Sequence, residues 1–345
     1  MRGVDAISLG NTAFEGLNNA YVLDGAVTTL VDTGVSTPDT RRQLHEGLDA
    51  RGLAFEDVEQ VLLTHWHADH AGLAGEIQSA SGAVVRAHRA DAPLIEQDPD
   101  AQAAMTARQR DLLATWGMPD APREELFDFL GGESTIAGDP AEVEPFEAGD
   151  SFEAGDRELT AVHLPGHTKG LSGFTVESEY RAPSGAAGAE LFSGDALLPY
   201  YTPNVGGADV RVERPLERYL ETLSEIVESG YARAWPGHRG PIVDPAGRAA
   251  DIVVHHRERT DRVLAVLEEH GPADAWTVSA HLFGELRSIH ILHGPGEAYA
   301  HLHHLESAGV VENTDGRYAI ADADADLDAL FPDVSDSDAR PEPST

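Results

Sequence analysis

Short apolar segments separated by turns occupy the first third of the chain. Three of them have the length of strands: residues 20–23, 27–31 and 58–63. Residues 69–81 follow, with Leu73 and Ile77 spaced as on one face of a helix, and residues 83–87 again resemble a strand. Strands that alternate with helices in this way predict an α/β layered fold.

The middle of the chain contains a helical segment and a turn-rich segment before further strands begin. Residues 90–116 predict helix, whereas residues 117–140 carry so many Gly, Pro and Asp residues that they predict a loop. We therefore expect residues 90–145 to form an insertion that could act as a lid. The elements predicted after it are strands at residues 158–164, 173–176, 190–192 and 232–235 and a helix at residues 215–229.

The pattern changes near residue 245. Helices are predicted at residues 252–269, 278–282 and 299–308, followed by a hairpin of residues 309–312 and 317–320. Three helices and a hairpin predict a winged helix, so we expect one domain at residues 1–245 and a winged-helix domain at residues 246–320. Residues 321–345 contain eight acidic and few large apolar residues, which predicts a disordered acidic tail.

Composition narrows the possible chemistry. The 345 residues contain no cysteine, which excludes disulfides and thiolate ligands, so any metal site must be built from His, Asp and Glu. No apolar run of about 18 residues occurs, and the first residues lack the apolar stretch of a signal peptide. We therefore expect a cytoplasmic protein with no membrane partner.

The charge balance is strongly acidic. Sixty acidic residues against 24 basic ones give a formal net charge of -36, and Lys169 is the only lysine. Such a surface resembles that of proteins from extreme halophiles, where molar salt screens charge repulsion over about 3 Å. We interpret the charge as adaptation to a salty solvent rather than as information about a partner.

The strongest chemical signal follows the apolar segment 58–63. Four potential metal ligands, His65, His67, Asp69 and His70, lie within six residues there. Imidazole and carboxylate groups suit divalent transition metals, and a loop at a strand end can bring them together. A single histidine would be read as a solvated loop residue, but four at this spacing favour a site. Three more candidates directly follow predicted strands: His167, Asp195 and His238.

The motifs HxHxDH, PGH, SGD and PGH, in this order, resemble the metallo-β-lactamase superfamily over about residues 4–245. The resemblance implies an αββα sandwich. It also implies that His65, His67 and His167 bind one divalent ion, that Asp69, His70 and His238 bind a second, and that Asp195 bridges them. Zinc is the default ion, with iron or manganese as alternatives. The catalytic role would fall to Asp69, which would position a metal-bridging hydroxide.

Residues near these motifs are candidates for supporting roles. Asp32 matches a position of the superfamily that ends a strand near the site, so the resemblance implies that it orients the histidine loop through hydrogen bonds without being a ligand. Lys169 could meet an anionic substrate, and Tyr200, Tyr201 and Asn204 could line the mouth of the site, although a plain surface or loop role explains these four residues equally well. Six other histidines are expected to have packing or surface roles: His163, His255, His256, His301, His303 and His304.

Missing features exclude some branches of the superfamily. Class B1 β-lactamases need a cysteine ligand, and β-CASP nucleases need a large insert where Asp195 and His238 are only 43 positions apart. Glyoxalase II-like thioesterases and the beta-lactamase-like protein 2 group remain. The pair His256-Arg257 and residues 301–311 resemble the latter group, whose members end in a winged helix.

These resemblances imply either hydrolysis of a thioester, as by hydroxyacylglutathione hydrolases, or endoribonuclease activity on single-stranded RNA. Residues 296–308, expected to form the recognition helix, contain no Arg or Lys, which favours a small acyl or thioester substrate. The winged helix would then be a structural module or would mediate a homodimer. An alternative of another class is a nucleic-acid-binding regulatory protein with a vestigial hydrolase domain, which the complete ligand set disfavours.

Overall fold

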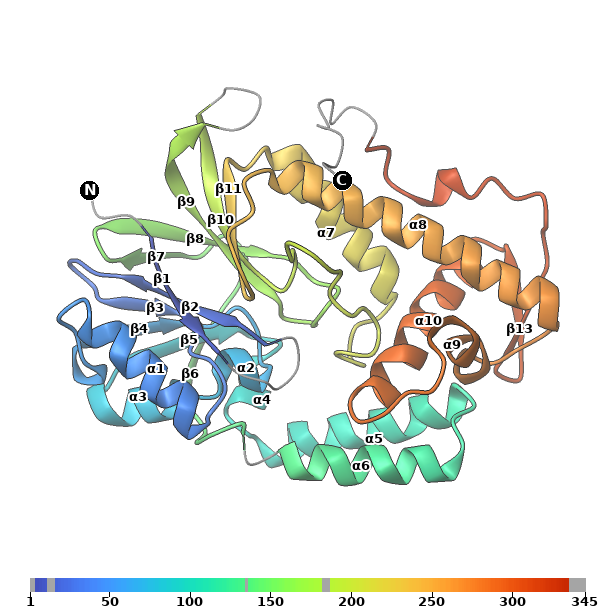
Figure 1. Cartoon of the computed structure of the whole chain (residues 1–345), viewed down its shortest axis with the longest axis horizontal. Helices are drawn as coiled ribbons and strands as arrows, with labels where there is room; N and C mark the ends of the chain where they lie inside the picture. Colours follow the sequence, from blue (N-terminus) through green and yellow to red (C-terminus); the bar gives the residue numbers. More distant parts are fainter. Residues whose placement is uncertain (1–3, 11–15, 134–135, 182–186, 335–345) are drawn as a thin grey trace.

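Two mixed β-sheets form the centre of the fold (Figure 1). A computed structural model describes residues 4–10, 16–133, 136–181 and 187–334. The first sheet has its strands in sequence order: β1 (Asp5–Leu9), β2 (Asn18–Leu23), β3 (Thr29–Val31), β4 (Gln60–Leu62), β5 (Val84–His88) and β6 (Val143–Phe146). The second has the order β11 (Arg233–Pro236), β10 (Ala187–Gly194), β9 (Ser172–Arg181), β8 (Arg157–His163) and β7 (Ser151–Ala154).

Alternating side chains on the strands divide the core into layers. On β2, Tyr21 and Leu23 point towards the second sheet, whereas Ala20 and Val22 pack among residues under the outer helices. This alternation follows from the two-residue period of a strand. The space between the sheets is filled by large side chains such as Phe174 and Phe192.

Helices cover the outer face of each sheet. The first sheet is covered by α1 (Pro38–Asp49) and α3 (Ala74–Ser81), and the second by α7 (Pro215–Ser229) and the first half of α8 (Pro245–His270). The result is the four-layered αββα arrangement that the sequence predicted. In the part of the chain that the structure describes, no helix has the length and apolar character needed to cross a membrane.

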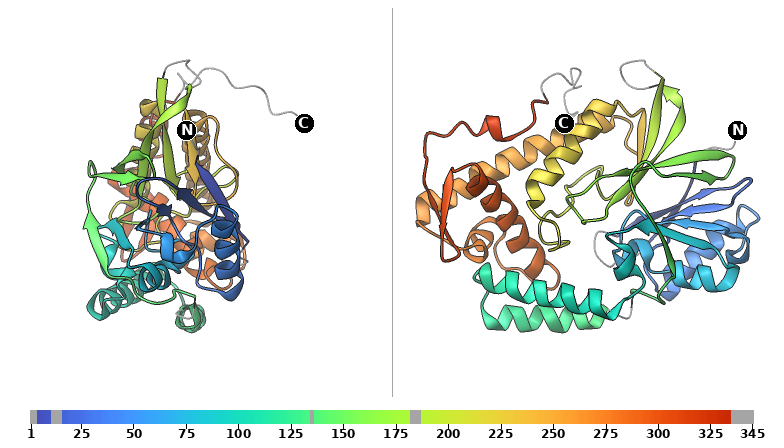
Figure 2. Two further views of the ribbon diagram at one scale, coloured as in Figure 1. Left: turned by 90° about the vertical axis from the view of Figure 1, so that its left-hand side faces the viewer. Right: turned by 180° about the vertical axis from the view of Figure 1, so that it is seen from behind.

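The insertion and the C-terminal helices share one apolar cluster. In the insertion, α4 (Ala92–Ile95) precedes two longer helices, α5 (Pro99–Thr115) and α6 (Asp120–Glu133). Figure 2 shows α5 and α6 lying against the C-terminal part of the chain, which consists of α8, α9 (Ala275–Phe283), α10 (His290–Ser307) and the hairpin of β12 (Val311–Thr314) and β13 (Arg317–Ile320). Trp116 and Leu126 from the insertion pack in the same cluster as Val263, Val278 and Leu302.

This packing bears on the predicted domain division. Helix α8 contributes Ile252 and Val253 to the core under the second sheet and Val263 and Leu267 to the cluster shared with the insertion. The chain therefore has no break in packing at residue 245. The expected three helices and hairpin are present, while the assignment to the winged-helix class and the lid role of the insertion stay predictions.

Three sequence predictions need correction. Residues 117–140 do not form a loop throughout, because Asp120–Glu133 is helix α6: Pro122 lies in its first turn, where proline is tolerated, and Leu126 and Leu130 pack on the shared cluster. The helix expected at residues 69–81 is split into α2 (Ala68–Ala71) and α3, because Leu73 between them departs from helical geometry, with φ -98° and ψ 1°.

The tail is the third correction. Residues 321–334 are ordered along α8 and α10, where Asp328 pairs with Arg257 at 2.8 Å and the Leu330 carbonyl accepts a hydrogen bond from His304 at 3.0 Å. These contacts and a short 3-10 helix, η2 (Asp328–Leu330), replace the predicted disorder. Residues 335–345 of the expected tail lie outside the described residues.

Candidate metal centre

The candidate ligands of the sequence analysis meet where strands of both sheets end. His65 and His67 follow β4, with Asp69 and His70 on the short helix α2. His167 follows β8, Asp195 follows β10 and His238 follows β11. Their ligand atoms form close groups: His65, His67 and His167; Asp69, His70 and His238; and Asp195 with His65 and His70.

Three imidazole nitrogens face one another in the first group. The Nε2 atom of His65 lies 2.9 Å from Nδ1 of His67, which lies 3.1 Å from Nε2 of His167. The outer nitrogens of two rings meet backbone carbonyls: His67 Nε2 is 3.0 Å from the Ala208 oxygen, and His167 Nδ1 is 2.9 Å from the Asn204 oxygen. A carbonyl can only accept, so these outer nitrogens donate, and in the neutral rings the inner nitrogens are left as lone pairs.

The same reasoning through Asp32 fixes the tautomer of His65. Asp32 accepts hydrogen bonds from the Thr64 backbone nitrogen and from Thr64 Oγ1, both at 2.8 Å. The Thr64 hydroxyl has thus donated its proton, so it accepts from His65 Nδ1 at 3.1 Å. The Nε2 atom of His65 is therefore a third inward lone pair. Asp32 also accepts from His70 Nδ1 at 2.9 Å, so it holds the histidine loop in the way the sequence predicted.

The second group combines carboxylates with two more inward imidazole nitrogens. His238 donates from Nδ1 to the Gly16 carbonyl at 2.9 Å, and its Nε2 faces Asp195 at 3.3 Å and Asp69 at 3.5 Å. The Nε2 atom of His70 lies 3.5 Å from Asp195 and 3.8 Å from Asp69. Asp69 further accepts from the Asn18 side chain at 3.1 Å, a contact that no sequence motif indicated.

The pKa values of histidines are shifted in opposite directions in the two groups. Burial, followed by the neighbouring His167, lowers the pKa of His67 to about 4, and burial together with His70 and His67 lowers the pKa of His65 far below its usual range. Burial also acts to lower the pKa of His238, but Asp195 and Asp69 outweigh it and raise that pKa to about 9. His65 and His67 thus reject protons, and the carboxylates of the second group attract positive charge.

These observations test whether metal ions fit the residues. Five histidines each turn one ring nitrogen inward while the other ring nitrogen is held by a carbonyl, a carboxylate or a hydroxyl. Within the described residues, His70 Nε2 and Asp195 Oδ1 are buried without a hydrogen-bond partner. A convergent set of nitrogen and carboxylate donors, oriented by outer hydrogen bonds, is what divalent transition metals prefer. The residues fit the implied ions.

A buried ionic triad that the sequence analysis missed supports the His167 loop. Asp91 and Asp209, both fully buried side chains, pair with Arg211 at 2.6 Å. Asp91 accepts hydrogen bonds from Thr168 and Gly170, and Asp209 accepts one from the backbone nitrogen of Lys169. These residues are scattered along the chain, so no local pattern could have marked them as a unit.

The C-terminal helices reach the site through Asn204. The Asn204 side chain donates to the His293 carbonyl and to Glu297, both at 3.0 Å, and accepts from the backbone nitrogen of Gly207, while its contact with a substrate stays a prediction. Glu297 is only 3% exposed and pairs with Arg259 of α8 at 2.7 Å. Helix α10 thus orients the loop whose carbonyl holds His167.

Glycines permit this contact between the loop and α10. A Cβ on Gly296 would lie 2.3 Å from Cα and 2.4 Å from the nitrogen of Gly207, and one on Gly206 would lie 2.4 Å from the Gly296 oxygen. Real Cβ atoms do not approach other atoms this closely. The two backbones touch because side chains are absent there.

The other predicted contacts lie at the surface. Tyr200 is 76% exposed, and Tyr201 accepts a hydrogen bond from Arg239, the residue after His238. The Lys169 side chain is exposed, and its role in binding an anion stays a prediction. His163 donates to the Lys169 carbonyl and stacks on His88, as expected for a structural residue.

The fold and the site define an α/β protein with a buried candidate metal centre at the edge between two sheets. Residues 13–180 match the family model of the metallo-beta-lactamase superfamily. A metallo-beta-lactamase family protein of known crystal structure from Thermus thermophilus is 30% identical; the match covers 93% of this chain and 99% of that one, with a TM-score of 0.78. The chain belongs to the metallo-beta-lactamase superfamily of hydrolases.

Curated relatives agree with this membership. The probable metallo-hydrolase YqjP of Bacillus subtilis (strain 168) is 29% identical over 83% of this chain and 87% of its own length. The beta-lactamase-like protein 2 homolog of Caenorhabditis elegans is 23% identical over 88% of this chain and 83% of its length. An atrochrysone carboxyl ACP thioesterase of Emericella nidulans is 24% identical over 75% of this chain, but the match covers 63% of the thioesterase. The superfamily predicted from the motifs is confirmed.

Proposed function

We propose that the chain hydrolyses a thioester or similar acyl substrate with two divalent ions, zinc by preference, at the His/Asp cluster. The observation that carries the proposal is the set of five inward imidazole nitrogens beside Asp69 and Asp195. His65, His67 and His167 would hold one ion, Asp69, His70 and His238 the other, and Asp195 would lie between them. Two such ions supply a hydroxide near neutral pH and polarise the acyl carbonyl.

The protein's own residues would orient this chemistry. Asp32, the Asn204 carbonyl and the Ala208 carbonyl keep the outer ring nitrogens protonated, so that the inner nitrogens stay available as ligands. Asp69, held by Asn18, would accept a proton as the nucleophile adds to the carbonyl.

The packing of α10 favours an acyl substrate over RNA. Buried residues occur along most of this helix, including Glu297, Ala298, His301 and Leu302, so it does not offer an exposed reading surface for a nucleic-acid groove. A thioesterase among the relatives is consistent with the acyl preference. Endoribonuclease activity and nucleic-acid binding without catalysis are the competing functions.

The test compares substrates and metal content in one set of preparations. The wild type, His67→Ala and the matched control His281→Ala are purified in molar KCl and assayed against S-lactoyl thioesters and single-stranded RNA. The control residue His281 is exposed on α9. We expect the wild type and His281→Ala to cleave the thioester. His67→Ala should lose both the cleavage activity and its bound metal.

Three results would contradict the proposal in different ways. Cleavage of RNA alone would overturn the substrate. Tight RNA binding without any cleavage would favour the binding protein. Elemental analysis with fewer than about one ion per chain would contradict the metal centre, because a preformed buried ligand set should retain its ions through purification.

A further inference from the structure

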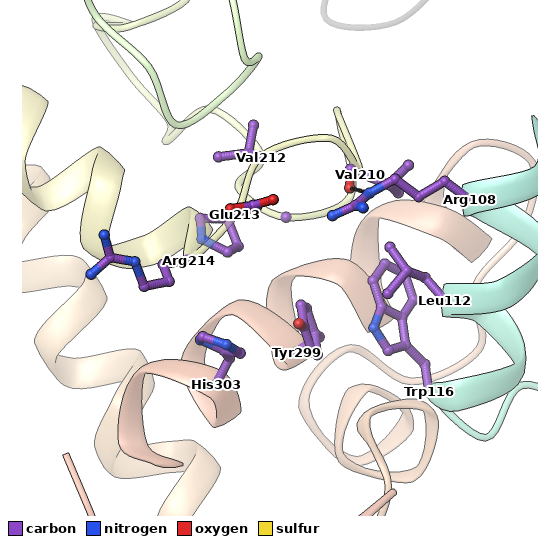
Figure 3. A pocket seen from close by; sticks show the side chains of 11 residues that line it. Arg108, Leu112, Trp116, Val210, Val212, Glu213, Arg214, Tyr299 and His303 are labelled. Atoms are coloured by element: carbon purple, nitrogen blue, oxygen red, sulfur yellow. Dashed lines mark hydrogen bonds between the residues drawn. The ribbon is translucent and has the colours of Figure 1, made fainter. Parts of the chain in front are cut away.

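A cavity of about 300 Å³ lies between the insertion helix α5, helix α10 and the loop that follows Asp195 (Figure 3). This volume is at the lower end of the range of small-molecule sites, about 300–1,000 Å³. None of the seven candidate metal ligands lines it. The cavity is therefore not the metal centre, and no role has been assigned to it above.

The loop from residue 204 to residue 214 separates the cavity from the metal centre. The carbonyls of Asn204 and Ala208 hold His167 and His67, whereas Gly206, Val210 and Val212 line the cavity. The two sites thus share one short segment of backbone but have different walls.

The polar groups of the cavity are mainly hydrogen-bond donors. Trp116 is 1% exposed, and its indole nitrogen has no hydrogen-bond partner among the described residues. Figure 3 shows this nitrogen on the ring edge that faces Tyr299, whose ring lies 5.3 Å away. An indole N–H can only donate, so a buried one without a partner indicates a missing acceptor.

Arg108 adds a positive charge on the same side. Its Nε donates to the Val210 carbonyl, and Figure 3 shows the guanidinium extending from α5 over the cavity. In the part of the chain that the structure describes, its two terminal nitrogens have neither a hydrogen-bond partner nor an ion pair. A cation left open in a chain of net charge -36 is a specific feature, since acidic side chains are abundant.

The other side chains that line the cavity indicate what kind of ligand it can hold. Leu112, Val212 and the Tyr299 ring provide apolar surface, which suits an aromatic or aliphatic body. The one carboxylate of the lining, Glu213, is exposed at the mouth. It would repel an anion there, but across solvent and therefore weakly.

We propose that this cavity is a binding site for a small organic carboxylate with an apolar or aromatic body. The carboxylate accepts hydrogen bonds from Arg108 and Trp116, and the body lies against Leu112, Val212 and Tyr299. The site is independent of the hydrolase proposal, since it uses none of the metal ligands.

Calorimetric titration of the purified full chain in molar KCl tests the site, with 3-phenylpropanoate as the probe and its neutral amide as the control. We expect one carboxylate per chain and about three- to tenfold weaker binding of the amide, because a charge-assisted hydrogen bond is lost.

Variants give changes of opposite sign. Arg108→Gln and Trp116→Phe should each weaken binding about three- to tenfold, whereas Glu213→Gln should tighten it about twofold by removing a like charge. The exposed His281→Ala on α9 should leave it unchanged. Trp116→Phe could disturb the packing of a buried residue, so the variants of the exposed residues Arg108 and Glu213 are the decisive ones. Absent binding, equal binding of acid and amide, an unaffected Arg108→Gln, or an equal loss of binding in His281→Ala would each overturn the proposal.

Discussion

Replacing Gly296 by alanine should damage the metal centre from a distance. Gly296 lies on α10, and the loop residue Gly207 touches it through backbone atoms alone. The same loop presents the Asn204 carbonyl to His167 at 2.9 Å. A methyl group on Gly296 would therefore press on the segment that holds a candidate ligand.

The magnitude follows from the overlap. The new Cβ would lie 2.3 Å from the Gly207 Cα, where ordinary contact begins at 3.4 Å, so a backbone must move by about 1 Å. Overpacking of this kind costs about 1–3 kcal/mol, and the better helix propensity of alanine returns about 1 kcal/mol. We expect a net loss of about 0–2 kcal/mol in unfolding free energy. A displacement of about 1 Å at a catalytic site can lower the rate about 100-fold, so activity should suffer more than stability.

Urea unfolding and the hydrolytic assay are measured together in the same KCl buffer. The matched control is Gly131→Ala in α6, where a Cβ would meet nothing within 4 Å and should stabilise the helix by up to about 1 kcal/mol. Wild-type activity in Gly296→Ala, or equal changes of stability and activity in both variants, would contradict this prediction.

Three further predictions concern the loop support, pH and salt. In Asp32→Ala, His70 loses the acceptor of its Nδ1 proton, so metal affinity should fall about 10- to 100-fold. Competition with a chelator measures this affinity, and Asp49→Ala, at an exposed position, should keep the wild-type value. Equal affinities of the two variants would refute the role of Asp32. Burial and the charge of His163 lower the pKa of His88 from 6.5 to about 4, so the folded chain refuses a proton that the unfolded chain accepts. The free energy of unfolding should thus decrease as the pH falls from 6.5 to about 4. His88→Gln should make this decrease smaller, and an unchanged dependence on pH would contradict the role of His88. The net charge of -36 predicts that the urea midpoint rises from low to molar KCl, and a constant midpoint would contradict the halophilic interpretation.

The sequence was sufficient for the parts of the site that are local in the chain. His65 to His70 follow a strand directly, and each of His167, Asp195 and His238 also stands where a strand ends, so the strand pattern alone places them at a common edge. Asp32 could be predicted for the same reason, because it ends a strand beside the histidine loop.

Contacts between residues that lie far apart in the sequence could not be predicted. Glu297 looks like a surface residue of a helix, and only the packing of α10 on the loop shows that it is buried against Arg259. The hydrogen bond from the Asn204 side chain to Glu297 joins residues 93 positions apart, so no local pattern indicated it. Helix α6 was missed because glycines and a proline outweighed Leu126 and Leu130, whose apolar partners lie on another part of the chain.

The cluster shared by the insertion and the C-terminal helices sets an order of assembly during synthesis. Met105, Leu113 and Leu126 lack the C-terminal half of their cluster until Ile291 and Leu302 leave the ribosome. At about 5–20 residues per second, this interval is on the order of 10–30 s. During that time α5 and α6 expose an apolar face on a nascent chain, and a truncated transcript that ends before α10 would yield a protein with this face permanently uncovered.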